Sequence, residues 1–221
     1  GPAAPRRVRL GRLVGRYVAE NRPAPLATLR PGVWYVDLDR VTDADFAAAV
    51  DSLAAARGIV FDLRGYPRRI STDPLANLTD VTLASPPWGA PVITRPDHRE
   101  ASYTFLSSAV APLAPRFHAR VAFVVDGRAI SRAETYLEPV AHYRLGEIVG
   151  EASAGTDGEV VTVALPGGYR ARFTGMKVLK NDGTRLHGVG VTPTVPVART
   201  RAGVAAGRDE LLERALEIVS R

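Results

Sequence analysis

Residues 33–63 read VWYVDLDRVTDADFAAAVDSLAAARGIVFDL, and this stretch decides the fold class. Its first six residues, Val33–Leu38, are β-branched, aromatic or aliphatic apart from one aspartate, a composition that favours a strand. Thr42 follows at a helix-cap position, with apolar residues at helical spacing as far as Gly58. Residues 59–63 form a short apolar run typical of a buried parallel strand. Strand, helix and strand in succession make a βαβ unit, so we expect an α/β protein.

Downstream of this unit, loop-rich and regular segments alternate. Eight prolines between residues 64 and 118 predict largely irregular structure there. A buried strand is expected at 121–126, followed by a helix that starts at Ile130-Ser131 and continues up to Pro139. From residue 159 the pattern becomes β-rich, and an amphipathic helix is expected at 209–219.

Upstream of the unit lies a basic segment, which we assign to an arm or linker of residues 1–30, with the core domain at 31–221. The net charge is +6, and residues 1–22 supply +5 of it through six arginines and one acid. Gly1-Pro2 resembles the remnant left when a protease removes a tag, and the arm is interpretable as part of an adjoining domain. Because the excess charge lies on a terminal arm and not on the folded body, we expect no nucleic-acid partner.

Composition excludes several classes of site. The chain has no cysteine, which removes disulfides, thiolate catalysis and cysteine-based metal sites. The four histidines show no metal-ligand spacing, and the glycines at 150–158 lack a Walker lysine, so we expect neither a metal nor a cofactor. No apolar run is long enough to span a bilayer.

Ser131 is the candidate nucleophile. It follows a predicted buried strand and opens a helix, whose N-terminal N–H groups and dipole could stabilise an oxyanion. A structural interpretation fits the same residues, because Ser131 and Glu134 have the spacing of a capping box. Spacing alone leaves both interpretations open.

Five motifs in order make residues 33–197 resemble the core of the tail-specific (C-terminal processing) serine peptidases. The blocks are Asp62-Leu63-Arg64-Gly65-Tyr66-Pro67, Ser131-Arg132-Ala133-Glu134, Gly150-Glu151-Ala152-Ser153-Ala154-Gly155, Leu165-Pro166-Gly167-Gly168 and Gly188-Val189-Gly190-Val191-Thr192-Pro193. The resemblance implies a ClpP/crotonase-like fold of stacked ββα units around a mixed sheet, with a C-terminal β-rich section and helix. It implies a serine endopeptidase that cleaves peptide or protein substrates through a Ser131 acyl-enzyme. It also implies an oxyanion hole formed by backbone N–H groups of Arg132 and of the Gly65-Tyr66 loop.

Departures from the family pattern concern the general base. The lysine of the Ser-Lys branch is replaced by Thr156, which cannot serve as that base. Arg68-Arg69 replaces a glycine pair beside the oxyanion loop. The chain is more similar to the branch of the tricorn core and the interphotoreceptor retinoid-binding protein, in which an N-terminal cap segment supplies a histidine. We therefore expect a base from a cap segment outside this chain, and a weak or inactive core without it.

Further expectations concern His187, the alternative functions and the location of the protein. His187 is the lesser candidate for a base inside the chain, against the alternative of a loop histidine bonded to backbone. The alternative function is a non-catalytic peptide- or lipid-binding module on the same fold, and an acyl-CoA enzyme of crotonase type is a weaker third. The resemblance implies export to the cell envelope or beyond.

Overall fold

The computed structural model describes residues 21–71, 73–97 and 99–221, and its centre is a six-stranded mixed sheet. The strand order is β1-β2-β3-β8-β9-β13, in which β1 pairs antiparallel with β2 and the other neighbours pair parallel. This confirms the α/β prediction. The sheet strands are β1 (Leu26–Arg30), β2 (Val33–Asp37), β3 (Gly58–Asp62), β8 (Arg120–Val125), β9 (Glu147–Gly150) and β13 (Val195–Pro196).

The predicted βαβ unit is present. Helix α1 (Asp43–Ala54) joins β2 to β3, and all five residues of β3 are buried. Thr42 caps α1, because its side-chain oxygen accepts a hydrogen bond from the N–H of Asp45. The carboxylate of Asp45 in turn accepts a hydrogen bond from the N–H of Thr42. This capping box fixes where the helix starts, as the sequence indicated.

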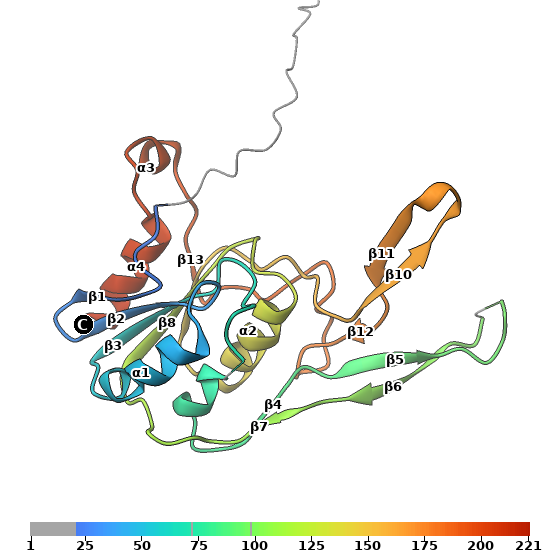
Figure 1. Cartoon of the computed structure of the whole chain (residues 1–221), viewed down its shortest axis with the longest axis horizontal. Coiled ribbons are helices and arrows are strands. Elements are labelled where there is room, and N and C mark those ends of the chain that lie inside the picture. The colour runs from blue at the N-terminus through green and yellow to red at the C-terminus, as the bar shows by residue number, and fades with distance from the viewer. Residues whose placement is uncertain (1–20, 72, 98) are drawn as a thin grey trace, which may run out of the picture.

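Helices cover both faces of the sheet (Figure 1). On one face, α1 and α2 (Arg132–Tyr143) pack over a core that includes the stacked rings of Phe61 and Phe123, 5.3 Å between centroids. On the other face, α4 (Glu210–Val219) packs against β3, β8 and β9 through Leu211, Ala215 and other apolar residues. Burying apolar side chains on both faces explains the near-continuous hydrophobic runs of the central strands.

Three sequence expectations need correction. Residues 26–30, which we assigned to the arm, form strand β1, so the sheet begins before residue 31; residues 1–20 lie outside the described part. Helix α2 does not end at Pro139 but continues to Tyr143, because Leu137 and Val140 are fully buried on either side of the proline. Core packing there outweighs the hydrogen bond that proline removes. The proline-rich stretch also contains regular elements, namely η1 (Pro74–Leu78), β4 (Leu83–Ala84), β5 (Trp88–Val92), β6 (Ser102–Leu106) and β7 (Ala109–Val110).

Two β-hairpins project from the body, β5–β6 and β10–β11 (Figure 1). The second joins β10 (Val160–Ala164) to β11 (Arg170–Thr174) through η2 (Pro166–Gly168), and β12 (Lys177–Val178) pairs with β5. Directly opposed residues of an antiparallel pair share a face. One face of β10–β11 is therefore apolar, with Val161, Val163, Ala171 and Phe173, and the other carries Val160, Thr162, Arg170, Arg172 and Thr174. The last short helix, α3 (Arg201–Ala205), precedes α4.

Candidate active site

Ser131 lies between the end of β8 and the first turn of α2, as predicted, and its backbone is unusual. Its φ of 48° and ψ of −113° place a non-glycine residue in a disfavoured region. The other helix caps Thr42, Thr200 and Asp209 have φ of −103°, −94° and −104°. Capping an α-helix therefore does not require the conformation of Ser131, and a local constraint must maintain it.

Glu134 supplies that constraint. Its fully buried carboxylate accepts hydrogen bonds from the N–H groups of Ser131 (3.2 Å), Gly155 (2.6 Å) and Thr156 (2.7 Å), and from the hydroxyl of Ser153 (2.6 Å). The capping-box bond anticipated from the sequence is thus one part of a larger network. Glu134 ties the turn that carries Ser131 to the loop that carries the third family-like block.

A pocket of about 370 Å³ opens at Ser131. Its lining brings together three residues singled out from the sequence, namely Tyr66, Ser131 and Arg132. The remaining lining residues are Trp88, Thr135, Gly158, Glu159 and Val160. A larger pocket of about 670 Å³ lies at the opposite end of the central strands, around Arg120 and Glu147, and contains no serine or cysteine nucleophile. The smaller pocket is therefore the candidate site, because it holds the nucleophile.

The backbone donors expected for an oxyanion hole differ in availability. Arg132 is the first residue of α2, so its N–H has no acceptor within the helix. The N–H of Gly65 donates to the carbonyl of Leu63 at 2.9 Å. The N–H of Tyr66 donates to the Asp39 carboxylate at a longer 3.3 Å. Of the three predicted donors, the two in the 65–66 loop have acceptors within the chain.

His187 does not line the Ser131 pocket. Its Nε2 lies 2.5 Å from the carbonyl oxygen of Asp157, the arrangement of a loop histidine bonded to backbone. For this histidine to reach Ser131, that contact would have to break.

Asp157 is a titratable group beside the site that the sequence interpretation missed. Its side chain is fully buried and accepts hydrogen bonds from the Thr135 hydroxyl (2.9 Å) and the N–H of Gly158 (2.9 Å). Burial disfavours the charged form and raises the pKa of Asp157 to about 6. Thr135 and Gly158 both line the pocket, so Asp157 lies directly behind its wall. Asp157 follows directly after Thr156, the position of the missing lysine, and this place in the sequence could have identified it as a group beside the site.

A buried ionic network supports the loop that carries Tyr66. Arg64 contacts the carboxylates of Asp62 (2.6 Å) and Asp209 (2.7 Å), and the hydroxyl of Tyr35 donates to Asp62 (2.8 Å). Burial alone would raise the pKa of Asp62, but the adjacent Arg64 guanidinium outweighs it and holds this pKa below its ordinary value. The network joins the end of β3 to the start of α4.

Among residues 21–71, 73–97 and 99–221, no three His, Asp or Glu side chains gather where they could hold a metal ion. Within the same residues, no helix combines the length and apolar character needed to traverse a bilayer.

Comparisons with known proteins gave one family profile and several similar folds. The profile of peptidase family S41 matches residues 32–197. Among solved structures, a candidate peptidase from Parabacteroides merdae matches with a TM-score of 0.73 and 17% identity, over 89% of this chain and 64% of that one. Mature CPAF complexed with lactacystin matches with a TM-score of 0.66 and 14% identity, over 84% and 50% of the two chains. The tricorn protease matches with a TM-score of 0.53 and 11% identity, over 84% and 17%.

The chain thus spans less than two thirds of the length of each of these structures, and at these identities the likeness concerns the fold. A comparison with curated protein sequences found no match.

Proposed function

The chain belongs to peptidase family S41, and from this premise we propose that it is the core of a serine peptidase of the C-terminal processing type, with Ser131 as nucleophile. Within the family, we propose the branch of the tricorn core and the retinoid-binding modules, because Thr156 stands in place of the lysine of the Ser-Lys branch.

The observation that carries the proposal is the backbone of Ser131. A φ of 48° is strained for serine, and Glu134 maintains it at the mouth of a pocket. Strained residues of this kind concentrate at active sites, where the strain positions a reacting group. A purely structural cap gains nothing from this conformation, as the other helix caps illustrate.

The mechanism follows from this placement. The Ser131 hydroxyl loses its proton to a base while its oxygen attacks the scissile carbonyl, and the tetrahedral oxyanion forms at the N-terminus of α2. There the N–H of Arg132 and the helix dipole stabilise the negative charge. Collapse expels the amine, which takes up the proton, and water then hydrolyses the acyl-enzyme. In this proposal the N–H of Tyr66 is the second oxyanion donor, once the carbonyl oxygen has displaced Asp39 from its 3.3 Å contact.

We place the base outside residues 1–221. In the described part of the chain, the hydrogen bonds of Ser131 go to Glu134 and to backbone groups of α2, and none goes to a histidine or lysine. His187, the lesser candidate, is engaged by the carbonyl of Asp157. A histidine from a cap segment completes the site, so we expect the isolated 221-residue chain to be inactive toward peptides.

The test is covalent labelling of the intact protein, meaning this chain together with the proposed cap segment. The probe is a peptidyl phosphonate that carries an apolar side chain, and mass spectrometry of the digest locates the adduct. We expect a single adduct on Ser131 and none after Ser131→Ala. Ser102→Ala, on the exposed strand β6, is the matched control and should leave labelling unchanged. Labelling at another residue, or none in the intact protein, would overturn the role of Ser131.

The alternative is a non-catalytic peptide- or lipid-binding module. Two observations favour it, namely Thr156 in place of a base and the carboxylate of Asp39 on the N–H of Tyr66. The intact protein would then bind peptides or lipids at the pocket without hydrolysing peptides. Peptide hydrolysis that is lost in Ser131→Ala removes this alternative.

A further inference from the structure

Arg68-Arg69, the pair that replaces the family's glycines, is not used by the mechanism above. Both side chains are exposed, and the guanidinium of Arg68 lies 5.9 Å from the ring centroid of Tyr66, which lines the Ser131 pocket. Arg69 is close enough to Asp45 to lower the pKa of that carboxyl, although the hydrogen bonds from Thr42 lower it more. Arg68 is therefore the member of the pair that lies beside the pocket.

A second cation belongs to the pocket itself. Arg132 is one of the lining residues, and its guanidinium lies over the ring of Tyr136 at 5.7 Å, with a 3.2 Å hydrogen bond to the hydroxyl. The backbone N–H of Arg132 has the oxyanion role proposed above, but its side chain is a separate group, held at the wall by Tyr136.

Hairpin β10–β11 contributes two further cations. Its strand pairing places Arg172 and Arg170 on the same face as Val160 and Thr174. Val160 lines the pocket, and Thr174 lies against Gly158, which also lines it. The face with the two arginines therefore continues along the hairpin from Val160 at the pocket.

Acidic groups at the pocket are few. Glu159 is its one exposed acidic lining residue, and Asp157 lies buried behind the wall. Among the described residues, no salt bridge joins Arg68, Arg170 or Arg172 to an acid. Cations from three separate segments thus lie at or beside the pocket, and of these Arg132 is partly offset by the carboxylate of Asp73.

We propose that this cationic rim, formed by the side chains of Arg68, Arg132 and Arg172, selects peptide segments with acidic side chains next to the bond presented to Ser131. The inference deepens the proposed function and rests on it, because only a peptidase presents a peptide bond to Ser131 for cleavage. Guanidinium groups bind carboxylates through paired hydrogen bonds, which gives both charge and geometric complementarity. A chain-terminal carboxylate offers the same chemistry, so the experiment must separate the two sources.

The experiment measures binding of fluorescein-labelled peptides to the intact protein carrying Ser131→Ala, by anisotropy at low salt. Three short peptides of glycine, alanine and valine are compared. The first has two central glutamates and an amidated C-terminus, the second has glutamines in their place, and the third has the glutamines with a free C-terminal carboxylate. We expect the glutamate peptide to bind at least fivefold more tightly than the glutamine amide, with the difference shrinking at physiological salt because exposed charges are screened.

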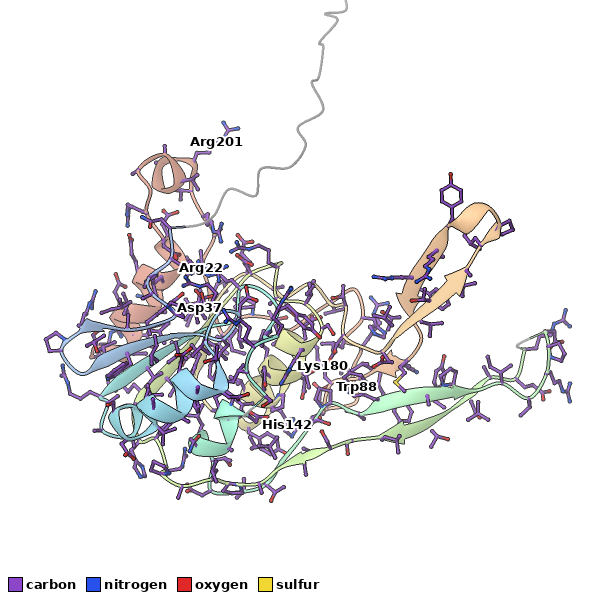
Figure 2. All side chains as sticks on the ribbon, viewed as in Figure 1. Arg22, Asp37, Trp88, His142, Lys180 and Arg201 are labelled. Carbon is purple, nitrogen blue, oxygen red and sulfur yellow. The ribbon has the colours of Figure 1, made fainter. Side chains whose placement is uncertain are left out.

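Variants locate the effect. Arg68→Gln and Arg172→Gln should each weaken binding of the glutamate peptide roughly two- to fivefold, the range of an exposed ion pair, and should leave binding of the glutamine amide unchanged. The matched control is Arg201→Gln on α3, an exposed arginine that Figure 2 places far from Trp88 at the pocket, and it should change neither.

Equal binding of the glutamate and glutamine amides, or equal losses from Arg68→Gln and Arg201→Gln, would overturn the proposal. Preference for the free carboxylate over internal glutamates would also overturn it, in favour of terminal recognition. None of these outcomes depends on hydrolysis, so failure here is distinct from failure of the phosphonate test. If the protein binds acidic peptides but is not labelled by the phosphonate, the cationic rim is supported and the peptidase function is rejected.

Discussion

The strained backbone of one residue, Ser131, is maintained by another, the buried carboxylate of Glu134. Three backbone N–H groups from two separate segments converge on that carboxylate. The sequence predicted Glu134 as a capping partner. It could not predict the contacts with Gly155 and Thr156, because these depend on how a distant loop folds over the helix.

The strain at Ser131 can be measured with two substitutions. Glycine adopts a φ of 48° without the steric cost of a Cβ, whereas alanine keeps that cost. We therefore expect Ser131→Gly to be more stable than Ser131→Ala by about 1 kcal/mol in urea unfolding. At Ser102, in a regular strand, the order should reverse, since glycine there only adds freedom to the unfolded chain. The same order at both positions would argue against stored strain at Ser131.

Asp157 gives the stability a defined dependence on pH. Its pKa rises from the ordinary 3.8 to about 6 in the folded protein, so the fold favours the neutral carboxyl. Stability contributed by this residue is present at low pH and is lost as pH rises through about 6. Relative to Asp157→Asn, the wild-type free energy of unfolding should fall between about pH 4 and pH 7 by up to about 3 kcal/mol.

Urea unfolding of both proteins across that range checks the prediction. Taking the difference between the two removes the contributions of other titrating groups. A difference that stays flat, or that grows in favour of the wild type as pH rises, would contradict it.

At the scale of elements, those set by local sequence signals could be predicted, and those set by tertiary packing could not. The unit β2–α1–β3 was predictable because the apolar spacing and the Thr42 cap agree with each other. The length of α2 was not, because burial of Val140 carries the helix past Pro139. Hairpin β5–β6 was hidden by Pro91 and Pro96. Strand β12 pairs only with Trp88 and Gly89 of β5, so at Pro91 the strand has β6 as its one neighbour and proline costs less there.

Hairpin β10–β11 should be the first regular element to open. Its strands form a two-stranded sheet, and nearly all their residues are exposed. An isolated two-stranded hairpin is at best marginally stable in water. In hydrogen exchange followed by mass spectrometry, we expect its amides to exchange at least a hundredfold faster than those of the fully buried β3. Equal protection of the two would mean that another chain covers the hairpin in solution.

At the scale of the whole molecule, α4 connects the far end of the chain to the oxyanion loop. Asp209 caps α4 through the N–H of Leu212 and also pairs with Arg64, whose side chain is almost fully buried. The family profile ends at residue 197, before this helix. The sequence predicted the helix but gave no sign of this contact, because 145 residues separate the two partners.

Two substitutions at Asp209 separate its two contributions. Asp209→Ser keeps a helix cap but removes the ion pair, and Asp209→Ala removes both. We expect losses of about 1–2 kcal/mol for serine, because Arg64 retains Asp62, and about 1 kcal/mol more for alanine. Urea unfolding measures the stability, and the rate of phosphonate labelling in the intact protein reports on the loop. No loss with serine would mean that the pair contributes nothing to stability.

The position of α4 in the sequence has a consequence for folding during translation. Every strand that α4 covers is translated before it, so a ribosome releases the apolar face of β3, β8 and β9 well before the helix that shields this face exists. Until Leu211, Ala215 and Val219 emerge, the nascent sheet carries an exposed hydrophobic surface of the kind that chaperones bind and that promotes aggregation. Synthesis of α4 is therefore the step that covers this surface and lowers the risk of aggregation.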